Sequence, residues 1–239
     1  MRARAFALLA FALAAAPAWA QTTPPVTPPS IFPASDGIIL GAAFAGSMVL
    51  VQYDARITAW KGLTPFRNSP GTGRVLDAAA FIGGPGSVGI EAAMWGAGRV
   101  WKNKNLATDG ETAFEAAALS GVATYLVKGL AGRARPYLDS TRANNFSFGR
   151  GISTSEDYQS FSSEHTAAAF AFATAMTARL SARHSPSVKW AAPVMYGIAT
   201  LTGVARVYRH DHWASDCLFG AAIGTVSGLV SERWHERHP

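Results

Sequence analysis

The chain lacks the residues that build disulfide scaffolds and structural zinc sites. Cys217 is its single cysteine, so an intramolecular disulfide and a cysteine-rich zinc site are both excluded. Cys217 follows Asp216 in a stretch rich in alanine and glycine. We therefore expect a buried thiol that packs against its neighbours rather than one that reacts.

The alternation of Val, Ile, Thr and aromatic residues that marks β-strands is nearly absent as well. In its place, six helix-length segments rich in alanine, glycine and larger aliphatic residues follow one another, separated by Pro, Gly, Asn and charged residues. These segments are predicted near residues 36–53, 74–101, 111–130, 163–182, 189–208 and 213–235. The pattern predicts an all-α protein, a six-helix bundle.

Local signals predict where some of these helices begin and bend. Asp36 is expected to cap the first helix, and Thr108 or Asp109 the third. The segment Gly83-Gly84-Pro85-Gly86 is expected to break or sharply bend the second. Residues 137–159 have little periodicity and are predicted to form a loop near the functional region.

The first twenty residues have the pattern of a secretory signal peptide. Arg2 and Arg4 precede an apolar run, and Ala18-Trp19-Ala20 is a small-x-small cleavage site. We expect a leader over residues 1–20, a proline-rich linker over 21–33 and a single helical domain over 34–239. The leader indicates export to a bacterial cell envelope, on its periplasmic side.

Charge and hydropathy limit the partners. A formal charge of +6 favours anionic small molecules or anionic membrane surfaces, whereas the lack of long basic tracts with interleaved aromatics argues against nucleic acid. The strongly apolar windows 37–51 and 217–230 fall short of the roughly 18 to 20 residues of a membrane span. A soluble or peripherally attached domain is therefore favoured, while an integral bundle stays open. The oligomeric state is not predicted.

Three clusters of cations and histidines stand out, in residues 128–136, 161–166 and 206–216. Lys128 and Arg135 are seven residues apart, which predicts that both lean over one helix face before Pro136 ends the helix. Arg206 supplies a third cation. Fixed cations can stabilise the negative charge that spreads over a phosphoryl group in transfer.

Each histidine cluster has both a functional and a purely structural interpretation. His212 and Asp216 are four residues apart, so on a helix the carboxylate can bond one ring nitrogen and leave the other free to attack an electrophile. A surface pair that adds a little stability is the alternative. His165 lies just before an Ala/Phe-rich helix, where Ser162 or Ser163 either caps the helix or joins backbone N–H groups that face an anion.

A metal site is a competing interpretation of this region. His210, Asp211, His212 and Asp216 form a dense group of potential ligands. On one helix, however, residues 210 and 212 point apart, and no third histidine has ligand-like spacing. No metal is predicted.

The three clusters resemble the motifs of the type 2 phosphatidic acid phosphatase and vanadium haloperoxidase superfamily, over about residues 111–230. The first motif, Lys, six residues, Arg-Pro, is complete at Lys128, Arg135 and Pro136. The second, Pro-Ser-Gly-His, reads Ser162-Ser163-Glu164-His165. The third, Ser-Arg, five residues, His, three residues, Asp, reads Ala205, Arg206, His212 and Asp216. Proline, glycine and serine are thus replaced by Ser162, Glu164 and Ala205.

The resemblance implies a helical bundle in which His212 attacks phosphorus and Asp216 orients it. His165 would protonate the leaving alkoxide and later activate water. The phosphate would be held by Lys128, Arg135, Ser163, Glu164 and Arg206, with Glu164 contributing its backbone N–H and adding a carboxylate that would repel phosphate if it turned inward. No metal or organic cofactor would be required.

The implied function is a metal-independent phosphatase that hydrolyses phosphomonoesters or lipid phosphates through a phosphohistidine intermediate. Its partner would be a phosphorylated small molecule or a lipid head group, and contact with a membrane is left open. Two alternatives remain. One is a non-catalytic envelope protein that binds phosphate or phospholipid, which the replacement by Glu164 motivates. The other is a vanadate-dependent haloperoxidase, because the same cations bind vanadate.

Overall fold

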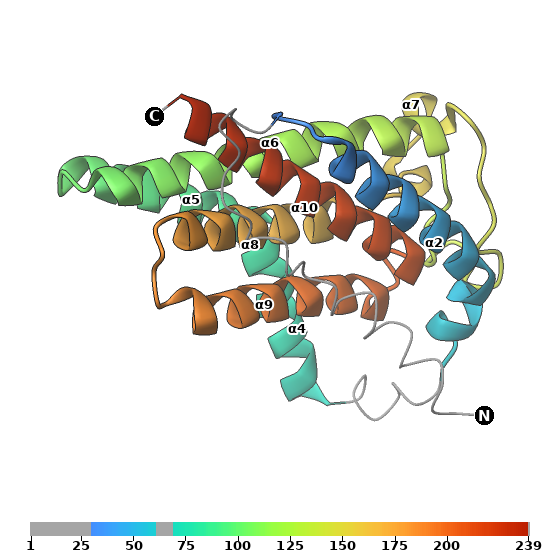
Figure 1. The fold of residues 1–239 in the computed structure, drawn as a ribbon. Coiled ribbons are helices and arrows are strands. Elements are labelled where there is room, and N and C mark those ends of the chain that lie inside the picture. Colours follow the sequence, from blue (N-terminus) through green and yellow to red (C-terminus); the bar gives the residue numbers. More distant parts are fainter. Residues whose placement is uncertain (1–29, 61–68, 239) are drawn as a thin grey trace.

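A computed structural model describes residues 30–60 and 69–238, and within these ranges the chain is helical with no β-strand (Figure 1). The predicted leader and most of the predicted linker lie outside the described residues. The helices are α2 (Ala34–Thr58), α4 (Pro70–Gly83), α5 (Pro85–Val100), α6 (Lys104–Ala131), α7 (Arg150–Ser153), α8 (Glu164–Ala182), α9 (Val188–Tyr208) and α10 (Ala214–Arg237), with a 3-10 helix η2 (Glu156–Tyr158). The all-α prediction is confirmed.

The predicted number of six helices was wrong. The described residues contain eight α-helices, because the segment predicted over 74–101 forms both α4 and α5 and because the short α7 lies inside the predicted loop. The break falls where it was expected. Gly84 has φ −112° and ψ −115°, outside the helical region, and Pro85 then starts α5 at a position where its missing N–H costs nothing.

The prediction that Asp36 caps the first helix was also wrong. Pro33 precedes α2, and Asp36 lies in the first turn. Its buried carboxylate accepts a hydrogen bond of 2.6 Å from the Arg233 guanidinium of α10. Because a buried carboxylate needs a partner, Asp36 ties the start of α2 to the last turns of α10.

The start of α6 likewise differs from the prediction. Asn103 caps this helix by accepting a hydrogen bond of 3.1 Å from the Leu106 amide. Asp109 lies one turn further along, where its carboxylate binds the guanidinium groups of Arg179 and Arg183. Asp109 therefore joins α6 to α8 rather than beginning α6.

Helices α8 and α10 lie side by side in the middle of the bundle (Figure 1). Gly220, Gly224 and Gly228 are spaced one turn apart on α10, and a Cβ on any of them would collide with α8. Gly220 faces the Ser163 backbone and Gly224 the Ala167 backbone, so the two helices run in the same direction. This glycine stripe brings the first turns of α8 and α10 together.

The outward faces of several helices carry large apolar side chains. The exposed ones include Ile38, Phe44 and Val49 on α2, Trp95 and Val100 on α5, and Phe114, Val122, Tyr125 and Leu126 on α6. Helices α2 and α10 are long and apolar enough to cross a bilayer, and both extend beyond the predicted windows 37–51 and 217–230. They differ in setting, since the apolar window of α2 is 11% buried and that of α10 is 72% buried.

Candidate active site

The first cluster does not form one helix face as predicted. Gly132 takes a left-handed conformation, φ 53°, and ends α6 four residues after Lys128. Lys128 lies in the last turn of α6 and Arg135 lies in the loop that follows. The Lys128 side chain still reaches the first turn of α8, and the Arg135 side chain reaches the loop before α10. Lys128 Nζ binds Glu164 Oε2 at 2.8 Å, and an Arg135 guanidinium nitrogen lies 3.5 Å from the Asp211 carbonyl.

The second cluster places Ser163 at the N-cap of α8, as one of the two readings predicted. Its side chain does not cap the helix, because Ser163 Oγ lies 2.9 Å from Thr166 Oγ1. Its amide donates to the Asp216 carbonyl at 3.1 Å. That backbone bond fixes the start of α8 against the start of α10.

His165 lies in the first turn of α8 with Gly84 packed against its ring, where a Cβ would collide. Burial lowers the pKa of His165 to about 4, and the positive charge of Arg206 acts in the same direction, as does His212 when it is protonated. In the free protein His165 is therefore neutral near pH 7. A bound phosphate would act against these charges and favour the protonated ring.

His212 lies in the loop before α10 and not on a helix, because the extended conformation of Trp213, ψ 159°, separates it from the first turn. Its Nδ1 bonds the Ser160 carbonyl at 2.7 Å, and Asp216 Oδ2 lies 3.7 Å from the same nitrogen. The structure thus brings the predicted pair together, although the carboxylate lies beyond ordinary hydrogen-bond distance, and the expectation that His212 lies on a helix was wrong. A carbonyl oxygen accepts only, so Nδ1 carries the hydrogen and Nε2 keeps its lone pair.

Burial of the ring lowers the pKa of His212, although the nearby Asp216 carboxylate acts in the opposite direction. The neutral imidazole is therefore favoured, which is the form that a nucleophile requires. Asp216 is fully buried at the third position of α10 and accepts from the Trp213 amide at 2.8 Å and from Ser160 Oγ at 2.5 Å. Ser160 thus holds both members of the pair.

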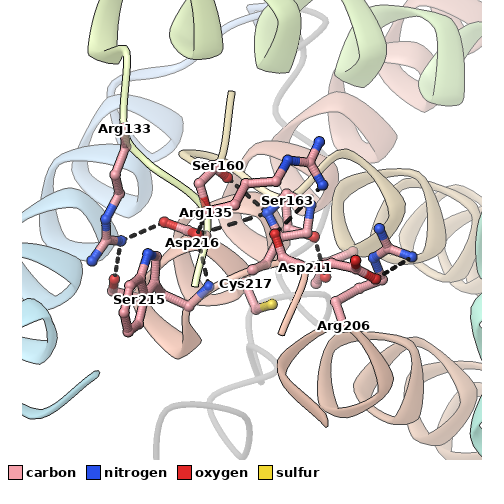
Figure 2. Close-up of polar contacts among 12 residues, drawn as sticks. Arg133, Arg135, Ser160, Ser163, Arg206, Asp211, Ser215, Asp216 and Cys217 are labelled. Carbon is pink, nitrogen blue, oxygen red and sulfur yellow. Dashed lines mark hydrogen bonds and ion pairs between the residues drawn. The ribbon is translucent and has the colours of Figure 1, made fainter. Parts of the chain in front are cut away.

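Arg133 is the main functional candidate that the sequence did not single out (Figure 2). Its fully buried guanidinium donates to Asp216, to Ser215 Oγ at 2.7 Å and to Asp54 Oδ2 at 2.8 Å. Asp54 is also fully buried and belongs to α2, 79 residues earlier in the chain. The only available signal was the position of Arg133 in the first cluster, which does not separate it from Arg135.

Arg206 lies in the last turn of α9 and binds Asp211, Nη1 to Oδ2 at 3.1 Å. Asp211 also receives the Arg135 contact through its carbonyl, so this residue lies between the two predicted phosphate-binding arginines (Figure 2). Across residues 30–60 and 69–238, no three His, Cys, Asp or Glu side chains are grouped as a metal site requires. Cys217 is buried as predicted, with Sγ 3.5 Å from the Gly203 carbonyl.

The fold therefore brings the ends of α6 and α9 to the beginnings of α8 and α10. The residues predicted to act gather in this region, and they are Lys128, Arg135, Ser163, Glu164, His165, Arg206, His212 and Asp216. Three cations and two histidines lie in this region, and these residue types can stabilise the charge of a tetrahedral anion. One histidine has a free lone pair, and the other can carry a proton.

Comparisons with known proteins show a family and related sequences. The family model described as PAP2 superfamily matches residues 112–239. Lipid A 1-phosphatase of Porphyromonas gingivalis is 41% identical over 86 residues, which are 36% of this chain and 18% of that protein's length. The chain thus matches less than a fifth of that relative.

A solved structure shares the fold. It is described as the first transmembrane PAP2 type phosphatidylglycerolphosphate phosphatase from Bacillus subtilis. The likeness has a TM-score of 0.64 at 18% sequence identity, and it covers 86% of this chain and 96% of that one. At this identity the likeness concerns the fold alone.

Proposed function

The chain belongs to the PAP2 superfamily, and on this premise we propose that it is a metal-independent lipid-phosphate phosphatase with His212 as its nucleophile. The observation that carries the proposal is the setting of His212. Its Nδ1 is bound by the Ser160 carbonyl at 2.7 Å, and the Asp216 carboxylate lies 3.7 Å away. The lone pair on Nε2 is thereby oriented and available.

In the first step, Nε2 of His212 attacks phosphorus, and the bond from phosphorus to the alkoxide oxygen breaks. Protonated His165 gives its proton to that oxygen, which leaves as an alcohol. Lys128, Arg135 and Arg206 stabilise the equatorial oxygens. The positive charge that develops on His212 is stabilised by Asp216, the carboxylate that Arg133 and Ser160 hold in place.

In the second step, neutral His165 accepts a proton from water, and the water oxygen attacks the phosphohistidine. The phosphorus–nitrogen bond breaks, inorganic phosphate leaves and His212 recovers its lone pair. The two steps return both histidines to their starting forms.

The lipid assignment rests on the surface of the protein. Large apolar side chains are exposed on α2, α5 and α6, and extensive exposed apolar surface is typical of protein or membrane interaction sites. We propose that α2, whose 25 residues are mostly unburied, enters a bilayer and that the substrate is a phosphorylated lipid. The leader pattern supports a site on the periplasmic side.

The test is phosphate release by the purified protein with a chelator present. The substrates are a soluble aryl phosphate and lipid phosphates in mixed micelles, and the variants are His212→Ala and His238→Ala. His238 is exposed at the end of α10 and serves as the matched control. We expect turnover that resists the chelator, prefers lipid phosphates, is lost in His212→Ala and persists in His238→Ala.

A second function is supported by one contact. Glu164 Oε2 binds Lys128 Nζ at 2.8 Å, so one predicted phosphate-binding cation is already paired. Because Glu164 also stands where the family motif has glycine, the second candidate is a protein that binds phosphorylated lipids without turning them over. Phosphate release that is absent with every substrate, together with retained phosphate binding, would select this function over the phosphatase.

A further inference from the structure

Glu164 stands where the related motif has glycine, and its side chain contacts the phosphate-binding region. Lys128 Nζ and Glu164 Oε2 are 2.8 Å apart. The two partners differ in exposure, since the lysine side chain is 8% exposed and the glutamate side chain is 55% exposed. The carboxylate therefore approaches the buried ammonium from the solvent side, which is also the side from which an anion would arrive.

The pairing has an electrostatic reason. A buried ammonium group without a partner is costly, so Lys128 needs a negative charge close by in the free protein. Among the described residues, Glu164 is the ionic partner of Lys128. A phosphate bound at the same ammonium would supply the same compensation.

Ionisable groups on three elements lie around Glu164. Burial acts to raise the pKa of its carboxyl group, but the charge and hydrogen bond of Lys128 on α6 outweigh this effect and lower it, and His165 on α8 and His212 in the loop before α10 act in the same direction when they are protonated. Glu164 therefore remains ionised at neutral pH. The same groups are the ones proposed to surround the substrate phosphate.

We propose that the Glu164 carboxylate is an internal counter-ion that occupies Lys128 in the free protein and must be displaced by the substrate phosphate. This inference rests on the proposed function, because it assigns Lys128 to phosphate. Displacement makes phosphate binding weaker than the cations alone would give. Product release is favoured in return, since the returning carboxylate competes with inorganic phosphate for Lys128 and helps the phosphate to leave.

The test measures binding of inorganic phosphate by calorimetry, using the full chain in detergent. Glu164→Gln removes the charge and keeps the shape, and Glu164→Ala removes the contact. Glu111→Gln is the matched control, because Glu111 is exposed on α6 about 25 Å along the helix from Lys128. We expect both Glu164 variants to bind phosphate about tenfold more tightly than the wild type, and Glu111→Gln to bind it equally.

The outcomes separate this inference from the proposed function. Unchanged or weaker binding in folded Glu164→Gln and Glu164→Ala would overturn the inference and leave the phosphatase intact. Tighter binding in a protein that releases no phosphate from any substrate would support the inference while the phosphatase fails. Absence of phosphate binding by all four proteins would overturn both.

Discussion

Two groups of charges lie in the candidate site, and they differ in how their charges are paired. On one side, Arg133 and Asp54 are fully buried, and their charged atoms bind each other, Asp216 and the Ser215 hydroxyl. On the other side, Lys128 binds a half-exposed glutamate, and Arg206 binds the partly exposed Asp211. The first group is closed to a ligand, whereas the partners of the second can be replaced by one.

The same residue types therefore have different roles within one site. Buried charges that are fully paired within the protein fix the position of Asp216 and hence the environment of His212. Cations whose partners face solvent remain available to bind an anion. Arg133 belongs to the first, closed group, whereas Arg135, only two residues later, lies on the open side with Lys128 and Arg206.

The largest effect is expected from a substitution in the first group, the closed side of the site, which contains Arg133 and Asp54. Arg133→Met leaves the carboxylates of Asp54 and Asp216 buried without their shared cation, so we expect the free energy of unfolding to fall by about 3–5 kcal/mol. Equilibrium unfolding in detergent measures this. The control is Arg142→Met, which removes an arginine whose side chain is 77% exposed and should cost less than about 1 kcal/mol. Equal losses in the two variants would contradict the division.

The pH profile tests the open side. With a pKa of about 4, His165 loses its proton in the free protein as pH rises through that value. We therefore expect kcat/KM to fall about tenfold per pH unit above it, because the proton donor is lost. The corresponding limb in kcat should lie at higher pH, since the bound phosphate raises the pKa of His165. Coincident limbs would show that His165 does not face the phosphate.

A substitution of one open-side cation should change binding and leave stability alone. For Lys128→Met we expect inhibition by inorganic phosphate to weaken about tenfold, because one charge-assisted contact is lost. The midpoint of thermal unfolding should stay close to that of the wild type. Unchanged inhibition would remove Lys128 from the phosphate site.

The smallest expected effect concerns Ser160, which touches both His212 and Asp216. Ser160→Ala keeps the carbonyl that binds His212 and removes the hydroxyl that donates to Asp216 at 2.5 Å. We expect kcat to fall about fivefold with little change in KM, in line with one lost hydrogen bond. A changed KM with normal kcat would instead place Ser160 in substrate binding.

Much of this organisation could be predicted from the sequence, because helices and motif spacings are local properties. The all-α class and the break at Gly84-Pro85 follow from composition and from glycine and proline alone. The contacts that define the site could not be predicted in the same way. Gly132 ends α6 before Arg135, and the extended Trp213 separates His212 from α10, so neither residue lies on the helix that spacing predicted, although Asp216 still lies near His212.

Long-range partners were beyond local patterns altogether. Asp54 reaches Arg133 from a helix 79 residues away, and nothing near Asp54 in the sequence indicates a catalytic region. The Lys128–Glu164 pair spans 36 residues, and the sequence showed only that Glu164 replaces glycine. The second of these contacts involves the first turn of α8, which packs against the glycine stripe of α10.

Trapping the covalent intermediate tests most directly whether His212 is the nucleophile. The protein is mixed briefly with substrate, quenched in alkali, which preserves phosphohistidine, and digested for mass spectrometry. We expect one phosphoryl group on the peptide containing His212, absent from His212→Ala and discharged when turnover is allowed to finish. Active protein that carries the phosphoryl group on Ser163, or that never carries one on His212, would contradict this role of His212.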